Sequence, residues 1–271
     1  MKPYQMIALD IDGTLLNSEK KVPPECACAI RQAAAAGKTV VFCTSRAVSE
    51  LEEFFDLLPE IRYAVFASGG GIYDIAERRA FALRGIPRSQ ADAVMDAVKT
   101  KDLMPQIVLA DRDVIQASQM AALERYHMGV YRPLYEKAMT LVEDIFAFYH
   151  ACQDEILKIN LYHADPAERI RTREQLSSLP IEKVYSEESS LECSALGINK
   201  GTGLKRLCDE LGILPEHCIA VGDAENDIPM IRAAGLGVAM GNAPPHVRRE
   251  ADRVVGDLDH GGCAEAVRLA L

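Results

Sequence analysis

The chain has 271 residues, 49% of them hydrophobic, and carries a formal net charge of −10 at pH 7. This length suffices for one large or two modest domains with a packed core. The negative charge argues against a broad surface for nucleic acid or for an anionic membrane. No apolar stretch approaches the ~18 residues of a membrane span, and acidic residues interrupt the N-terminal run, so we expect a cytoplasmic protein without a signal peptide. The eight cysteines have no zinc-ligand spacing, which predicts reduced, mostly buried thiols.

Short apolar runs alternate with helical patterns at both ends of the chain. The runs are residues 6–9, 39–43, 63–67, 218–222, 236–240 and 252–255. They are too short for helices and show little alternation, which is typical of buried parallel strands. The helical patterns cover residues 23–37, 47–58, 200–212 and 226–235. This order predicts an α/β fold with a doubly wound, Rossmann-like parallel sheet.

The middle of the chain has a different pattern, in which strands are bracketed by helices without the glycine turns of parallel sheets. Helices are predicted at residues 88–100, 121–128, 141–151 and 165–178, and strands at 106–110, 111–118 after a turn, 156–163, 181–186 and 190–194. We expect an inserted α+β unit with a largely antiparallel sheet. The predicted core is therefore residues 1–81 and 191–271, and the predicted insert is residues 82–190.

Two carboxylates end the first predicted strand, in the stretch MIALDIDGTLLN. Ligands of parallel α/β sheets bind beyond the carboxyl ends of the strands, where Asp10 lies. Residues two apart on extended chain face the same side, so Asp10 and Asp12 can address one site. Gly13 allows the chain to turn sharply. The alternative is a pair of solvated acids in a loop.

A second predicted strand, CIAVG, leads into the stretch GDAENDIPM. Asp223 then occupies the same kind of position as Asp10, and Asp227 begins the next helix. Carboxylates gathered at one sheet edge repel one another unless a cation lies among them, and oxygen-only ligands favour Mg²⁺. Asp227 can instead be a helix N-cap, or serve both purposes.

Groups suited to an anion follow at two other helix starts. Thr44, Ser45 and Arg46 end the strand TVVFC with hydroxyl and backbone N–H groups. Lys200 begins a predicted helix, where the helix dipole disfavours a cation. Helix capping and a free surface lysine are the ordinary alternatives. Together with the acids, these groups favour phosphoryl transfer, because a carboxylate that attacks a phosphoryl group needs Mg²⁺ and a lysine to offset repulsion.

The four segments DIDGT, the strand-end Thr44, Lys200 and GDxxND, in this order, resemble the haloacid dehalogenase superfamily of phosphohydrolases. The resemblance covers the whole chain. The insertion between the second and third motifs is similar to a type IIB cap. The stretches SGGGIYD, LECSALGINKG and MGNAPPHVRREAD resemble the Cof-like subfamily.

The resemblance implies a role for each matching residue. Asp10 would be the nucleophile that forms an aspartyl-phosphate, and Asp12 would protonate the leaving oxygen and then activate water. Thr44 and Lys200 would hold the phosphoryl oxygens. Mg²⁺ would be bound by Asp10, the backbone carbonyl of Asp12 and Asp223, with Asp227 as a ligand or orienting its waters and Asn226 beside them.

The chain departs from the subfamily pattern at two positions. Ser45 stands where the second motif usually has glycine, which predicts a narrower phosphate loop. Ser68 stands where relatives carry asparagine, so we expect Ser68 and Gly69 to be secondary substrate-binding residues.

The expected activity is hydrolysis of small phosphorylated metabolites, with sugar phosphates as the expected substrates and with neither nucleic acid nor membrane as a partner. A phosphomutase or phosphotransferase would use the same intermediate, and a non-catalytic sensor of phosphorylated metabolites would have lost the nucleophile or the acid. The sequence indicates neither the oligomeric state nor which polar residues of the insert select the substrate; Asp111, Arg125, His127 and Arg132 are more typical of a solvated surface.

Overall fold

The computed structural model describes residues 4–271, which divide into two compact units. The first unit comprises residues 4–45, 53–82 and 199–271, and the second comprises residues 46–52 and 83–198. These limits differ from those expected at residues 82 and 190. The last strand of the second sheet runs to Ala195, and residues 46–52 pack with the second unit although the chain reaches them from the first.

An eight-stranded sheet forms the centre of the first unit, in the order β14-β13-β12-β1-β2-β3-β4-β5. The strands are β1 (Met6–Leu9), β2 (Thr39–Cys43), β3 (Tyr63–Phe66), β4 (Gly71–Asp74), β5 (Arg79–Phe81), β12 (Cys218–Gly222), β13 (Leu236–Ala239) and β14 (Arg253–Val254). All pairs from β14 to β3 are parallel, whereas β4 and β5 are antiparallel additions. The predicted doubly wound parallel core is confirmed.

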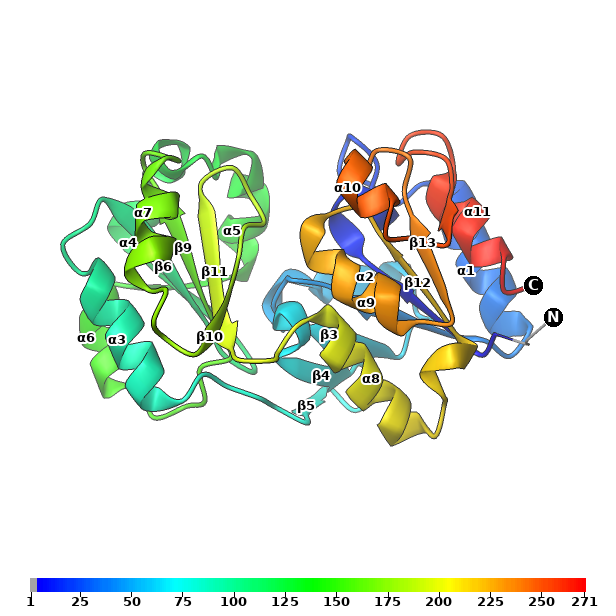
Figure 1. Cartoon of the computed structure of the whole chain (residues 1–271), viewed down its shortest axis with the longest axis horizontal. Coiled ribbons are helices and arrows are strands. Elements are labelled where there is room, and N and C mark those ends of the chain that lie inside the picture. The colour runs from blue at the N-terminus through cyan, green and yellow to red at the C-terminus, as the bar shows by residue number, and fades with distance from the viewer. Residues whose placement is uncertain (1–3) are drawn as a thin grey trace. The chain divides into compact units, whose positions relative to one another are not determined.

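Helices cover both faces of this sheet (Figure 1). The longer ones are α1 (Pro24–Ala35), α2 (Glu52–Leu57), α8 (Lys200–Leu211), α9 (Ile228–Ala233) and α11 (Gly262–Arg268), with the short α10 (Pro245–Arg248). Leu204 and Leu207 of α8 and Met230 of α9 pack on one face of the sheet with Val41. Phe54 of α2 contacts Phe42 on the other face, where α1 and α11 lie side by side. The central strands are thus buried on both faces, which explains their continuous apolar sequences.

The hairpin of β4 and β5 is not predicted from sequence because its strands are short. Asp74 closes its turn by accepting hydrogen bonds from Ala76 N and Glu77 N, both at 3.1 Å, and it pairs with Arg62.

The predicted helix over residues 47–58 is interrupted in the structure. Its first turn is a 3₁₀ turn, η2 (Val48–Glu50), in which the side chain of Glu50 accepts from Ala47 N.

The second unit contains a six-stranded sheet in the order β10-β11-β9-β6-β7-β8. Its strands are β6 (Leu103–Val108), β7 (Asp113–Gln116), β8 (Met139–Val142), β9 (Lys158–His163), β10 (Ile181–Val184) and β11 (Ser190–Ala195). Every pair except β7 and β8 is antiparallel. The helices α3 (Arg88–Val98), α6 (Ile145–Ala151) and α7 (Glu168–Gln175) accompany a core that includes Val94, Tyr149 and Ile159.

Two predicted helices of this unit are wrong in part. The expected helix over residues 141–151 begins only at Ile145, since Asp144 caps it by accepting from Phe146 N and Ala147 N, and the preceding residues form β8. The expected helix over 121–128 is replaced by α4 (Ala117–Met120) and the 3₁₀ turns η4 (Leu123–Tyr126) and η5 (Gly129–Tyr131), before α5 (Arg132–Ala138). His127, with φ of 60°, ends η4 in the left-handed conformation.

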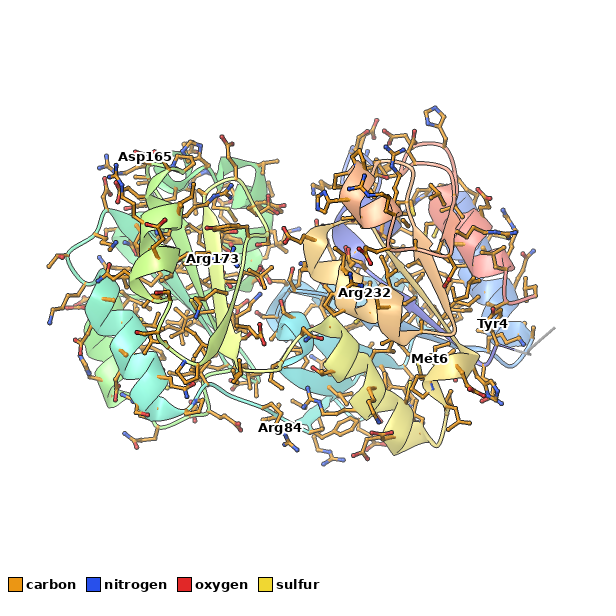
Figure 2. The ribbon with its side chains drawn as sticks, in the orientation of Figure 1. Tyr4, Met6, Arg84, Asp165, Arg173 and Arg232 are labelled. Carbon is orange, nitrogen blue, oxygen red and sulfur yellow. The ribbon has the colours of Figure 1, made fainter. Side chains whose placement is uncertain are left out.

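Side chains follow the expected division between core and surface (Figure 2). Met6 at the start of β1 is fully buried, whereas Arg173 on α7 and Arg232 on α9 are exposed. Seven of the eight cysteines are buried and Cys28 is exposed, so the predicted burial of most thiols is confirmed. Within residues 4–271, no helix is both long and apolar enough to cross a membrane.

A buried histidine gives the second unit a predicted pH dependence. His163 Nδ1 lies 3.0 Å from Ser189 O, and its Nε2 lies 2.9 Å from Thr172 Oγ1, so the neutral ring donates through Nδ1 and accepts through Nε2. Burial lowers the pKa of His163. The unfolded chain therefore binds the proton first as the pH falls below about 6.5, and we expect the free energy of unfolding to fall by at most about 1.4 kcal/mol per pH unit there.

Urea unfolding of the His163→Gln variant between pH 5 and 8 tests this expectation. In His163→Gln, the free energy of unfolding should decrease less below pH 6.5 than it does in the wild type. His127→Gln changes a more exposed histidine of the same unit, and its free energy of unfolding should decrease as much as in the wild type. Equal acid-side slopes in the wild type and His163→Gln would contradict the assignment.

Candidate active site

Three parallel strands of the first unit end at one edge of the sheet and carry the predicted polar residues there. β1 pairs with β12 on one side and β2 on the other, with Leu9 opposite both Val221 and Phe42. Asp10, Thr44 and Asp223 directly follow these strands. The sheet register therefore brings together residues that are up to 213 positions apart (223 − 10).

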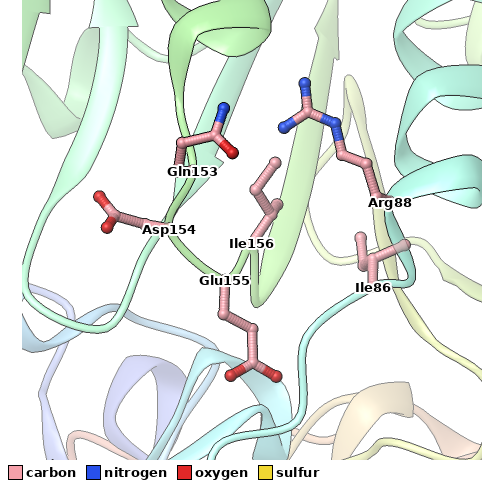
Figure 3. Close-up of a pocket in the computed structure, with 6 residues that line it drawn as sticks. All are labelled: Ile86, Arg88, Gln153, Asp154, Glu155 and Ile156. Carbon is pink, nitrogen blue, oxygen red and sulfur yellow. The ribbon is translucent and has the colours of Figure 1, made fainter.

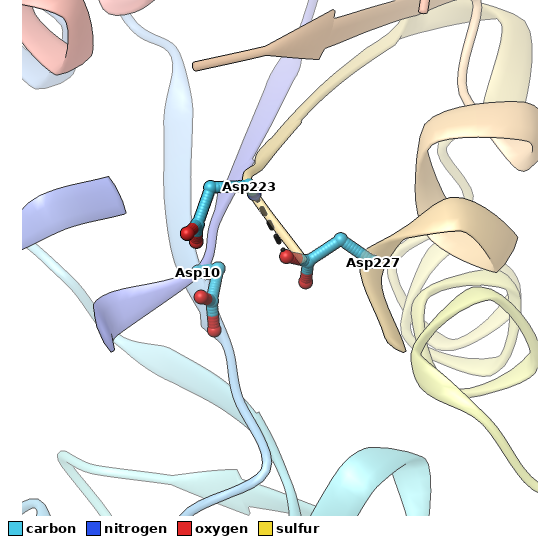
Figure 4. A group of neighbouring side chains, drawn as sticks. All are labelled: Asp10, Asp223 and Asp227. Carbon is cyan, nitrogen blue, oxygen red and sulfur yellow. Dashed lines mark hydrogen bonds between the residues drawn. The ribbon is translucent and has the colours of Figure 1, made fainter. Parts of the chain in front are cut away.

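Asp10, Asp223 and Asp227 form a compact group of carboxylates (Figure 4). One carboxylate oxygen from each lies within 4.8 Å of the others. Asp227 Oδ2 accepts hydrogen bonds from Asp223 N and Ala224 N, both at 2.9 Å. Asp227 therefore stabilises the turn that carries Asp223. It does not act as the side-chain N-cap of the following helix, because its carboxylate accepts no hydrogen bond from the first turn of α9.

Lys200 supplies the cation of this group. It is the first residue of α8, is 1% exposed, and its Nζ donates to Asp10 Oδ1 at 2.7 Å and to Asp227 Oδ1 at 2.6 Å. The cap of α8 is Asn199, whose side chain accepts from Thr202 N at 3.0 Å. The unfavourable position of a lysine at a helix start is therefore explained by two buried carboxylates.

The pKa values of these groups are strongly displaced. Burial, followed by the charge of Asp227, raises the pKa of Asp10 well above its usual value. The same two causes raise the pKa of Asp223 to about 7. Burial would lower the pKa of Lys200, but the charges of Asp10 and Asp227 outweigh it and raise that pKa. One lysine does not fully compensate the acids, so the group favours an additional cation.

The turn after Asp10 places the remaining acid outside the carboxylate group. The carboxylate of Asp12 is 27% exposed and accepts from Lys20 Nζ at 3.1 Å. Gly13 has φ of 83°, and a Cβ built there would lie 2.2 Å from Asp223 Oδ2. Gly13 is thus required both by its left-handed backbone and by close approach to Asp223. Thr14 Oγ1 donates to Asp223 Oδ1 at 3.2 Å.

Thr44 is buried at the end of β2. Thr44 and Ser45 belong to the first unit, whereas Arg46 belongs to the second. The backbone N–H of Thr44 donates to Val65 O at 2.9 Å. Ser45, the last residue of this part of the first unit, does not have positive φ, so the serine that replaces glycine is accommodated without left-handed strain. Arg46 belongs to the second unit and donates through Nη1 to Glu50 O at 3.2 Å.

The loop after β3 has left-handed backbone at three successive residues. The φ angles are 49° at Ala67, 55° at Ser68 and 94° at Gly69. Ser68 N donates to Thr44 O at 3.1 Å, which links this loop to the end of β2. Asparagine tolerates the left-handed region better than serine, so the Ser68 position carries backbone strain of about 1 kcal/mol.

Two asparagines, Asn226 and Asn242, also lie in the loops at this edge of the sheet. Asn226 is half-buried in the turn η7 (Glu225–Asp227), and its Oδ1 has no hydrogen-bond partner among the described residues. Asn242, which the sequence analysis did not single out, donates from Nδ2 to Gly13 O at 2.9 Å and to Asp223 Oδ2 at 3.1 Å. Its position in the stretch MGNAPP, after the next strand of the sheet, was the available signal.

A cavity of about 440 Å³ lies elsewhere, in the second unit (Figure 3). It is lined by Ile86, Arg88 and residues 153–156. The guanidinium of Arg88 is already bonded to Asp92, to Tyr149 O and to Cys152 O. Arg88 is the one cationic side chain among the described residues that line this cavity, so the cavity offers no free cation for a phosphate.

Comparison with known proteins gives the family. Residues 7–267 match the model of the haloacid dehalogenase-like hydrolases. The chain belongs to the haloacid dehalogenase-like hydrolase family. Membership confirms the resemblance carried by the four motifs, including its Cof-like character, and confirms that the chain is an enzyme of this family.

Individual relatives in the haloacid dehalogenase-like family match over nearly the whole chain. The 5-amino-6-(5-phospho-D-ribitylamino)uracil phosphatase YcsE of Bacillus subtilis is 29% identical over 97% of this chain and 94% of its own length. A haloacid dehalogenase-like hydrolase from B. subtilis is 27% identical, with a TM-score of 0.86 over all of both chains. A subclass IIB sugar phosphatase, 22% identical, shares the fold with a TM-score of 0.83 over 98% of each chain.

Proposed function

We propose that the chain is a Mg²⁺-dependent phosphatase that hydrolyses small phosphorylated metabolites through an aspartyl-phosphate on Asp10. The observation that carries the proposal is the contact of Lys200 Nζ with both Asp10 and Asp227, inside a group of three carboxylates. A buried cation beside a strand-end carboxylate is what attack on an anionic phosphoryl group requires.

The residues present fit a magnesium ion. The donors are carboxylate oxygens from Asp10, Asp223 and Asp227 without histidine or cysteine, which suits a hard cation. The raised pKa values of Asp10 and Asp223 indicate that these carboxylates lack compensating positive charge. When bound, the metal would neutralise phosphoryl oxygens and the attacking carboxylate.

The chain's own residues would provide the nucleophile, the phosphate-binding groups and the general acid and base. Asp10 Oδ would attack phosphorus as the ester oxygen leaves, and Lys200 would hold a phosphoryl oxygen together with the hydroxyl of Thr44. Asp12, which is more exposed than Asp10, would donate a proton to the leaving oxygen and later take one from the attacking water. Hydrolysis of the acyl-phosphate would then restore Asp10.

Sugar phosphates and phosphorylated sugar alcohols are the substrates that we propose to test first. The B. subtilis relative is named for a compound in which phosphate is carried by a ribityl chain. Primary phosphate esters of this kind present a small, exposed phosphoryl group.

Phosphate release from an aryl phosphate and from a panel of sugar and sugar-alcohol phosphates tests the proposal. We expect activity in Mg²⁺ and its loss after treatment with EDTA, with recovery when Mg²⁺ is restored. Inactivity on every ester in Mg²⁺, or full activity in EDTA, would overturn it. Running the reaction with an added sugar acceptor separates hydrolysis from transfer to a second hydroxyl.

A further inference from the structure

Asn242 joins three segments of the first unit that are distant in sequence. Its Nδ2 donates to Gly13 O at 2.9 Å and to Asp223 Oδ2 at 3.1 Å, and its Oδ1 accepts from Leu258 N at 3.1 Å. An asparagine amide has two N–H donors, and both are used here. A side chain with all these bonds has one orientation, which makes it a rigid spacer between its partners.

The bond from Asn242 completes the restraint of Asp223. Thr14 Oγ1 binds Asp223 Oδ1, and Asn242 binds Asp223 Oδ2, so each carboxylate oxygen has a donor from a different loop. The backbone N–H of Asp223 is in turn held by Asp227. Rotation of the Asp223 carboxylate would break at least one of these bonds.

The hydrogen bond from Asn242 to Gly13 O holds the turn that follows Asp10. Gly13 is left-handed and lies so close to the Asp223 carboxylate that no side chain fits between them. Gly13 directly follows Asp12, whose backbone carbonyl is a metal ligand according to the family resemblance. By binding Gly13 O and Asp223 together, Asn242 sets the separation between this turn and the carboxylate.

Asn242 is itself held in place by the backbone around it. Met240 N donates to Gly222 O at 3.0 Å, directly before Asp223, and Gly241 N donates to Gly256 O at 3.0 Å. Leu258 N then fixes the amide oxygen. The asparagine is therefore presented by a loop that is tied to β12 on one side and to the C-terminal segment on the other.

We propose that Asn242 is a positioning residue that holds Asp223 and the Gly13 turn in the orientation needed to bind Mg²⁺. This inference rests on the proposed function. Asn242 acts through the neutral donors of its amide, without touching the reacting atoms. Groups that orient metal ligands in this way affect metal affinity about 10- to 100-fold.

Calorimetric titration of the full chain with Mg²⁺, without substrate, tests the inference. Asn242→Ala and the similarly sized Asn242→Leu are expected to bind Mg²⁺ about 10-fold more weakly or worse than the wild type. At saturating Mg²⁺, the KM for an aryl phosphate should be unchanged, because Asn242 is not a substrate contact.

Ser18→Ala is the matched control. Ser18 also links the segment after Asp10 to the C-terminal loop, with Oγ donating to Asp259 Oδ1 at 2.9 Å. Among the contacts of the described residues, Ser18 forms no hydrogen bond to Gly13 or Asp223. Its Mg²⁺ affinity should equal that of the wild type. Wild-type affinity in both Asn242 variants, or equal weakening in Ser18→Ala, would overturn the positioning role alone. A wild type that neither binds Mg²⁺ nor releases phosphate would overturn the proposed function as well.

Discussion

Asp10→Asn is expected to lower the rate of phosphate release by about 10⁴-fold or more, the scale seen when a covalent nucleophile is removed. The amide has nearly the size of the carboxylate but cannot attack phosphorus. The steady-state rate with an aryl phosphate in Mg²⁺ measures the loss. Intact-protein mass spectrometry after acid quenching should show phosphorylated wild type and no phosphorylated variant.

The fold should withstand this substitution. Asp10 is only 5% exposed, and its raised pKa shows that the ionised form is disfavoured at its site, so a neutral amide costs little. Lys200 retains its contact with Asp227 at 2.6 Å. We therefore expect a thermal midpoint in EDTA that is no lower than that of the wild type.

Asp209→Asn is the control, since Asp209 lies on the exposed side of α8 and pairs only with Lys205 among the contacts described. It should retain wild-type activity. Undiminished turnover in Asp10→Asn would remove Asp10 as the nucleophile, and a collapsed fold in the same variant would contradict the electrostatic argument.

The parallel core could be predicted from sequence because burial on both faces leaves continuous apolar runs. The runs at residues 6–9, 39–43 and 218–222 correspond closely to β1, β2 and β12. The edge of the sheet lacked this signal: β4 and β5 are short antiparallel strands after a glycine-rich loop. In the second unit, β8 is half-exposed at the sheet edge, and the sequence pattern predicts a helix from residue 141 instead of this strand.

The convergence of the acids was also predictable, because parallel strands bring their carboxyl ends to one edge of a sheet. Asp10 and Asp223 meet there as expected, and Lys200, at the start of α8, binds Asp10 and Asp227. What the pattern could not give was the partner of each charge. Asp12 is turned toward Lys20, and Arg46 packs with the second unit, since side-chain direction depends on contacts that no local pattern encodes.

Asn242 shows a further limit of sequence reasoning. It carries no charge, its loop has no periodic signal, and its partner Gly13 is 229 residues away. A neutral side chain gains its role only from the backbone carbonyl and carboxylate that the fold places beside it. Such positioning residues are therefore found from coordinates rather than from the spacing of reactive groups.

Lys200→Met is expected to destabilise the metal-free protein by about 3–5 kcal/mol, because it leaves buried carboxylates without their cation. Urea unfolding in EDTA measures the loss, and added Mg²⁺ should restore part of it by supplying positive charge to Asp10 and Asp227. Lys205→Met, at an exposed lysine of the same helix, should change stability by less than about 0.5 kcal/mol. A Lys200→Met protein as stable as the wild type would contradict the pairing.

A second substitution separates the loss of charge from the loss of packing. Asp227→Asn keeps an oxygen that can accept from Asp223 N and Ala224 N but removes one negative charge. If Lys200 acts mainly by compensating charge, the double variant should be more stable in EDTA than Lys200→Met alone, because fewer buried charges then lack a partner. If Lys200 acted only by filling space, the two losses would add, and the double variant would be the least stable of the set.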